Sequence, residues 1–66
     1  MRYRVVIEKN GHNIQTLYWA GALEETLGLA RNIACKYEAD GLRIFELGGD
    51  EVWFEQRPFE GTSEDL

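Results

Sequence analysis

The chain has little of the chemistry that usually stabilises a small domain: one cysteine, one histidine and one proline in 66 residues. Cys35 alone cannot form a disulfide within the chain, and His12 without paired cysteines does not fit a structural zinc site. The N-terminal apolar run covers only Val5 to Ile7, too short for a secretory or membrane-spanning segment. These features predict a single cytoplasmic domain, stabilised by packing or self-association.

Positive charge is also scarce, with 7 Lys and Arg against 12 Asp and Glu and a net charge of −5. The basic residues are scattered, whereas binding to phosphate backbones needs clustered Lys and Arg. We therefore expect no direct contact with nucleic acid. The acidity either serves solubility or forms a surface that meets a basic partner.

No set of residues has the spacing of a catalytic, metal or cofactor site. Cys35 lacks a base, because His12 belongs to a turn remote in the sequence. Acidic pairs such as Glu24-Glu25 and Asp50-Glu51 are expected at element ends, where no cleft shifts their pKa values apart. Neither a phosphate loop nor a dinucleotide fingerprint is present. The expectation is a protein without enzymatic activity, metal or cofactor.

Residues 2–20 have the pattern of a β-hairpin around Asn10-Gly11, a strong signal for a two-residue turn. That turn predicts three pairs on one side of the ribbon: Ile7 with Ile14, Val5 with Thr16 and Tyr3 with Tyr18. Val6, Leu17 and Trp19 then lie on the other side among polar residues, with Arg2 opposite Trp19.

Residues 22–39 favour a helix, because apolar residues recur at steps of three and four. The stripe comprises Leu23, Leu27, Ala30, Ala34 and Tyr37, with Thr26 and Ile33 beside it. Glu24 and Glu25 suit the first turn of a helix, where its dipole favours negative charge. Gly41 after Asp40 is expected to end the helix.

Residues 42–56 predict a second hairpin around Gly48-Gly49-Asp50. A Gly49-Asp50 turn, which we favour, pairs Leu47 with Val52 and Phe45 with Phe54. A Gly48-Gly49 turn instead pairs Ile44 with Trp53. Residues 58–66 are acidic and unpatterned, so the domain is expected to span residues 1–57, followed by a flexible tail.

These elements give an α+β fold of order ββαββ: a four-stranded antiparallel sheet with one helix packed on one face. The pairing between the hairpins stays open, and a parallel central pair is an alternative. We place the Tyr3, Val5, Ile7 set and the Phe45, Leu47 set, with their hairpin partners, under the helix. Leu17, Trp19, Ile44 and Trp53 then occupy the uncovered face.

The order resembles that of short uncharacterised bacterial and phage proteins with an L-E-E-x-L-x-L-A-R helix. The residues of the pattern here are Leu23, Glu24, Glu25, Leu27, Leu29, Ala30, Arg31 and Gly41. The outline is also similar to that of small phage inhibitors of bacterial RNA polymerase. The resemblance implies the outline of the fold and assigns no functional residue.

Large apolar side chains on an uncovered sheet face usually mark an interaction site. The first functional hypothesis is therefore a non-enzymatic protein-interaction module, a homodimer that meets through Leu17, Trp19, Ile44 and Trp53. The alternative hypothesis is an acidic inhibitor of a nucleic-acid enzyme such as RNA polymerase. Its contacts would be Glu24, Glu25, Glu38, Asp50 and Glu51.

Overall fold

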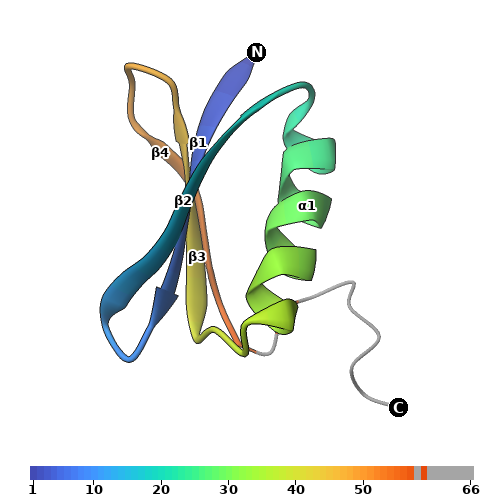
Figure 1. The fold of residues 1–66 in the computed structure, drawn as a ribbon. Coiled ribbons are helices and arrows are strands. Elements are labelled where there is room, and N and C mark those ends of the chain that lie inside the picture. Colours follow the sequence, from blue (N-terminus) through green and yellow to red (C-terminus); the bar gives the residue numbers. More distant parts are fainter. Residues whose placement is uncertain (58, 60–66) are drawn as a thin grey trace.

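The computed structural model describes residues 1–57 and 59 and confirms the ββαββ order (Figure 1). The strands are β1 (Arg2–Lys9), β2 (His12–Ala20), β3 (Gly41–Glu46) and β4 (Glu51–Gln56), and the helix is α1 (Leu23–Lys36). The four strands form one sheet in the order β2-β1-β3-β4, and every neighbouring pair is antiparallel. The central strands β1 and β3 are therefore antiparallel, and the parallel alternative for this pair is wrong.

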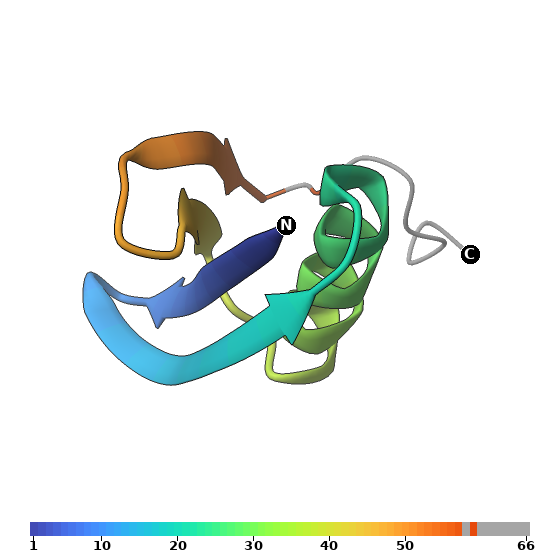
Figure 2. The same ribbon diagram turned by 90° about the horizontal axis from the view of Figure 1, so that it is seen from above.

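The helix covers one face of this sheet, as Figure 2 shows from above. Alternate side chains of the two central strands point toward α1 and are fully buried there: Val5, Ile7, Leu42 and Ile44. Each such side chain contributes about 1.5–3 kcal/mol when it leaves water. On the helix, Ala30 and Ala34 bring the backbone close to the sheet, and buried Thr26 donates its hydroxyl to the Ala22 carbonyl at 2.9 Å.

The first hairpin begins as expected, because Asn10 and Gly11 both adopt positive φ, at 55° and 80°. The predicted pairs beyond the turn are wrong. Ile14 has no partner in the ladder, and this β-bulge moves every later residue of β2 by one position. Leu17 therefore lies opposite Val5 and Trp19 opposite Tyr3, on the helix side of the sheet.

The consequence of that bulge is a change of face, since a one-residue shift turns every side chain over. Thr16 and Tyr18, predicted to lie under the helix, pair with Val6 and Arg4 on the uncovered face. Arg2 lies opposite Ala20 rather than Trp19.

In the second hairpin the favoured Gly49-Asp50 register is wrong, and Ile44 pairs with Trp53 as in the alternative. The loop is longer than in either choice, because the Glu46 N–H donates to the Asp50 carbonyl at 3.1 Å and leaves Leu47, Gly48 and Gly49 between these two residues. A second bulge at Val52 absorbs the extra residue. Ile44 is buried under the helix while Phe45 turns away, so the predicted faces of β3 and β4 are also reversed.

The helix is shorter than predicted, because Glu38 rather than Gly41 takes the left-handed conformation, with φ of 55°. The Glu38 N–H donates to Cys35 and the Ala39 N–H to Ala34, the hydrogen bonds of a Schellman motif. Tyr37 lies past the helix and is exposed.

The core extends beyond the expected boundary at residue 57, because Phe59 is only 4% exposed and belongs to the core cluster. The remainder of the expected tail, residues 58 and 60–66, lies outside the described residues.

Candidate interaction surface

The sheet face turned away from α1 carries alternating cations and large apolar groups, and we call this surface the open face. Its members are Arg4, Val6, Thr16, Tyr18, Arg43, Phe45 and Phe54. In one row across the sheet, Arg4 lies between Tyr18 and Phe45. In the next row, Arg43 lies between Val6 and Phe54. No helix of the described chain covers these rows (Figure 2).

Both arginines stack on aromatic rings. The Arg4 guanidinium carbon is 4.5 Å from the centroid of the Phe45 ring, and that of Arg43 is 4.2 Å from Phe54. Such contacts contribute about 0.5–1 kcal/mol at exposed sites. They also hold each guanidinium over a ring of the neighbouring strand.

The two arginines differ in their charge partners. Arg43 Nε donates to Glu8 at 3.1 Å and Arg43 Nη1 donates to Glu51 at 2.9 Å. The hydrogen bond to Glu51, followed by that to Glu8, raises the pKa of Arg43 above its ordinary value. Arg4 has no carboxylate within ion-pair distance among the described residues. Its positive charge is therefore available to a ligand.

The open face exposes much of its apolar surface to solvent. Tyr18 is 65% exposed and Phe54 is 44% exposed. Tyr18 and Arg4 also line a hollow of about 220 Å³ together with Glu46 and the Leu47–Gly49 loop. The surface thus combines exposed rings, the Arg4 guanidinium and a depression that can accept a side chain.

The four residues predicted to form the interaction patch lie on the other side of the sheet. Ile44 is fully buried, and Leu17 packs against the core. Trp19 and Trp53 are 41% and 36% exposed at the margins of the helix-covered face. The structure therefore does not bring Leu17, Trp19, Ile44 and Trp53 together on an uncovered surface.

Trp53 is held in place by polar contacts beside the helix. Its Nε1 donates to Glu55 Oε1 at 2.9 Å, and the same oxygen lies 2.8 Å from Arg31 Nη2. The Arg31 and Glu55 side chains are only 16% and 11% exposed, so this ion pair joins α1 to β4 in a region shielded from water. The hydrogen bond to Glu55 ties the Trp53 indole to this ion pair.

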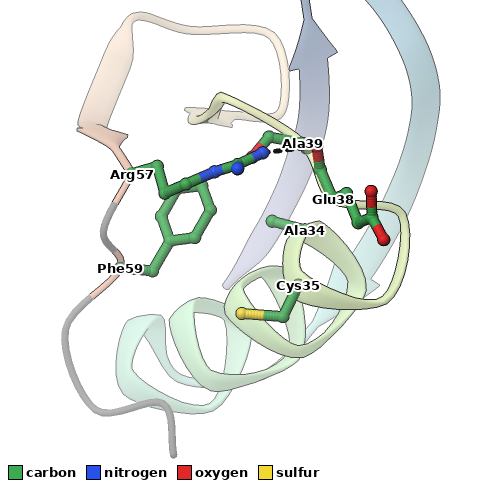
Figure 3. Close-up of a pocket in the computed structure, with 6 residues that line it drawn as sticks. All are labelled: Ala34, Cys35, Glu38, Ala39, Arg57 and Phe59. Atoms are coloured by element: carbon green, nitrogen blue, oxygen red, sulfur yellow. Dashed lines mark hydrogen bonds between the residues drawn. The ribbon is translucent and has the colours of Figure 1, made fainter. Parts of the chain in front are cut away.

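A second hollow, of about 270 Å³, lies at the C-terminal end of the helix and is lined by Ala34, Cys35, Glu38, Ala39, Arg57 and Phe59 (Figure 3). Arg57 is committed to main-chain carbonyls there: its Nε donates to Ala39 at 3.0 Å, and its Nη2 donates to both Glu38 and Ala39. Cys35 points into the space, and His12 is not among the lining residues. These hydrogen bonds of Arg57 link the segment after β4 to the residues that follow the helix.

The acidic residues of the alternative hypothesis are spread over the molecule. Glu24 and Glu25 stand in the first turn of α1, whereas Glu38 follows its last turn. The 14-residue helix separates them by about 21 Å. Asp50 and Glu51 belong to the β3–β4 hairpin, and Glu51 is bonded to Arg43. They do not form one acidic patch.

Across residues 1–57 and 59, no group of three or more His, Cys, Asp or Glu side chains is placed to hold a metal ion. Within the same residues, α1 lacks the length and apolar character needed to cross a membrane.

The open-face residues were missed although the sequence carries a signal for them. Arg4 and Arg43 stand between buried residues of central strands, and a cation in such a position marks the solvent side of the strand. Applied first, that criterion assigns Phe45 and Phe54 to the open face. No protein-family model, curated protein or solved structure matches the chain, so any assignment of function rests on this geometry.

Proposed function

We propose that the protein is a non-enzymatic interaction module that binds another protein through its open face. One observation carries the proposal: the uncovered side of the sheet displays Tyr18, Phe45 and Phe54 around Arg4, which has no carboxylate partner within residues 1–57 and 59. An exposed apolar cluster of this kind usually marks a binding surface.

The residue types support a protein as the partner. Tyr and Arg are enriched among the residues that dominate binding energy at protein interfaces. They combine a large rigid contact area with directed hydrogen bonds. The hollow beside Arg4 and Tyr18 provides a place for one anchoring side chain.

The distribution of charge supports a partner with acidic groups on its contact surface. Three arginines project from this side of the sheet (Arg2, Arg4 and Arg43) against Glu8 and Glu51, with Glu46 at the hollow, so the surface is locally balanced in charge. The whole chain carries −5. Charge is screened beyond about 8 Å. A few acidic side chains on a protein surface therefore interact mainly with Arg2 and Arg4, whereas a long polyanion extends over the molecule and is repelled by its net negative charge.

Affinity capture from the native host, with nuclease added, tests this proposal. The open-face variant is Arg4→Glu/Phe45→Ala, which reverses the cation and removes the ring beneath it. The structure offers a matched control, because Lys36 lies over the Tyr37 ring at 6.0 Å on the exposed end of the helix. The control variant is Lys36→Glu/Tyr37→Ala, which makes the same two changes there. Circular dichroism establishes that both variants are folded.

We expect a protein partner to be recovered by the wild type and by the Lys36/Tyr37 control, and lost with the Arg4/Phe45 variant. Equal recovery by all three proteins would remove the open face from the interaction. Recovery that depends on nucleic acid, and disappears with nuclease, would also contradict the proposal.

A further inference from the structure

The two edges of the sheet are protected to different degrees. β2 is a nine-residue edge strand, and eight of its positions are exposed. It contains no Asp, Glu, Lys, Arg or Pro, although these charged types make up 29% of the chain. Charges and prolines are the devices by which edge strands avoid pairing with other chains. β2 lacks both.

The opposite edge carries such devices. β4 has six residues, including Glu51 and Glu55, and its own bulge at Val52. The chain that follows is tied back to the β3 side, because the Arg57 N–H donates to the Asp40 carbonyl at 2.9 Å. The β4 edge therefore carries charged residues that oppose pairing with another chain, whereas the β2 edge is neutral.

We propose that a second copy of this chain pairs with β2, edge to edge and antiparallel, across a twofold axis at Thr16. Antiparallel pairing of a strand with itself makes its outward N–H and C=O groups complementary by symmetry. With Thr16 on the axis, residues 14–18 of the two copies lie opposite one another, and the bulge at Ile14 confines regular pairing to this segment. The neutral strand brings no like charges together.

The side chains match in the same register. Ile14, 41% exposed, lies opposite Tyr18 of the second copy, 65% exposed, and the pair occurs twice. Leu17 lies opposite Gln15 of the second copy, on the side of the sheet that faces the helices. Pairs of an aromatic with a β-branched residue are among the favourable cross-strand contacts. The dimer thus covers apolar surface that the monomer leaves in water.

One contact within β2 has to be exchanged on pairing. The Gln15 N–H donates to the Asn13 side chain at 3.0 Å, and Asn13 Nδ2 donates to Thr16 Oγ1 at 2.8 Å. Both bonds are exposed to solvent and therefore easily replaced by a main-chain carbonyl of the second strand.

A twofold axis perpendicular to the sheet gives eight continuous strands, with both helices on one side and both open faces on the other. The inference does not depend on the open face binding a partner. If both hold, each assembled dimer presents two copies of that surface side by side, which raises affinity for a repeated or extended partner.

Sedimentation equilibrium of the pure protein, up to concentrations on the order of 100 µM, tests the pairing. We expect a dimer for the wild type. Thr16→Lys and Thr16→Glu each place like charges opposite one another at the axis and weaken association by up to about fivefold. An equimolar mixture of the two variants restores the dimer, because Lys then lies opposite Glu. Gln56→Lys, on the β4 edge, serves as the control and leaves the dimer intact.

A wild type that stays monomeric throughout overturns the inference, and so do Thr16 variants that associate as the wild type does. A dimer lost in the Gln56→Lys control rather than in the Thr16 variants also overturns it. Arg4→Glu/Phe45→Ala changes no residue of β2, so loss of partner capture with this variant reports on the open face and the Thr16 variants report on the β2 edge.

Discussion

Phe59 tests whether the structural core continues past the last strand. The residue is 4% exposed and packs against the end of α1, where Ala34 and Ala39 are fully buried (Figure 3). An aromatic side chain removes about 150–250 Å² from water, worth about 4–6 kcal/mol at 25 cal/mol per Å². A compact unfolded state lowers that figure by roughly 10–40%. The adjoining hollow of about 270 Å³ lets water enter the space left by the ring, which lowers the cost further.

We therefore expect Phe59→Ala to lower the free energy of unfolding by about 2–4 kcal/mol. In a domain of this size, 1 kcal/mol shifts the melting temperature by about 4–8 °C. Phe54→Ala is the comparison: it removes an identical ring that is 44% exposed, so less apolar surface is lost and a smaller loss of stability than for Phe59→Ala is expected. Urea unfolding followed by tryptophan fluorescence measures both. Equal stability of Phe59→Ala and the wild type, within about 0.5 kcal/mol, would refute the burial of this residue.

Three further changes test local features, each by urea unfolding. Glu38→Gly is expected to stabilise the protein by about 0.5–1 kcal/mol, since Gly adopts the left-handed φ without a Cβ clash; an unchanged midpoint would contradict the Schellman geometry. Ala22→Ser is expected to add about 1 kcal/mol by completing a capping box in which Glu25 already accepts the Ala22 N–H at 3.3 Å, and a loss of stability would count against that cap. Deletion of Ile14 is expected to leave a folded protein with the same Trp19 emission, because it converts the bulged ladder into a regular one; an emission maximum shifted to that of a solvated indole would disprove this account of the register.

The existence and order of the elements follow from the sequence because their signals are local. Asn10-Gly11 sets the first turn, and the helical stripe predicts the residues that α1 buries, including Ala30 and Ala34. Tyr3, Val5 and Ile7 were placed under the helix correctly, since Arg4 and Glu8 on the opposite side have to remain near water.

Local signals in the sequence do not determine which side of β2 faces the helix. Its two sides carry similar sets, Leu17 and Trp19 on one and Thr16 and Tyr18 on the other, so the pattern favours neither. The turn alone then decides the prediction, and the turn is followed by a bulge. Because Ile14 is unpaired, every later side chain of β2 lies on the opposite face from the one predicted.

The second hairpin was misplaced for a different reason. Its side groupings were right, with Ile44 and Trp53 on one side and Phe45 and Phe54 on the other. The error lay in choosing the bulkier pair for the core. Burial of Phe45 would have pointed Arg43 under the helix, whereas in the structure Arg43 reaches Glu8 and Glu51 on the open face.

The reversal changes the residues of the proposed interaction surface and leaves its physical basis intact. The helix packs on β1 and β3 and covers only one face, while β2 and β4 both carry large apolar groups on both faces. Whichever face lies under the helix, the other presents aromatic side chains to solvent. The structure makes that surface Tyr18, Phe45 and Phe54 with two stacked arginines, in place of two tryptophans. Because Arg4 lacks a carboxylate among the described residues, the partner we propose is one that supplies a carboxylate. A patch of indoles would have carried no such preference for charge.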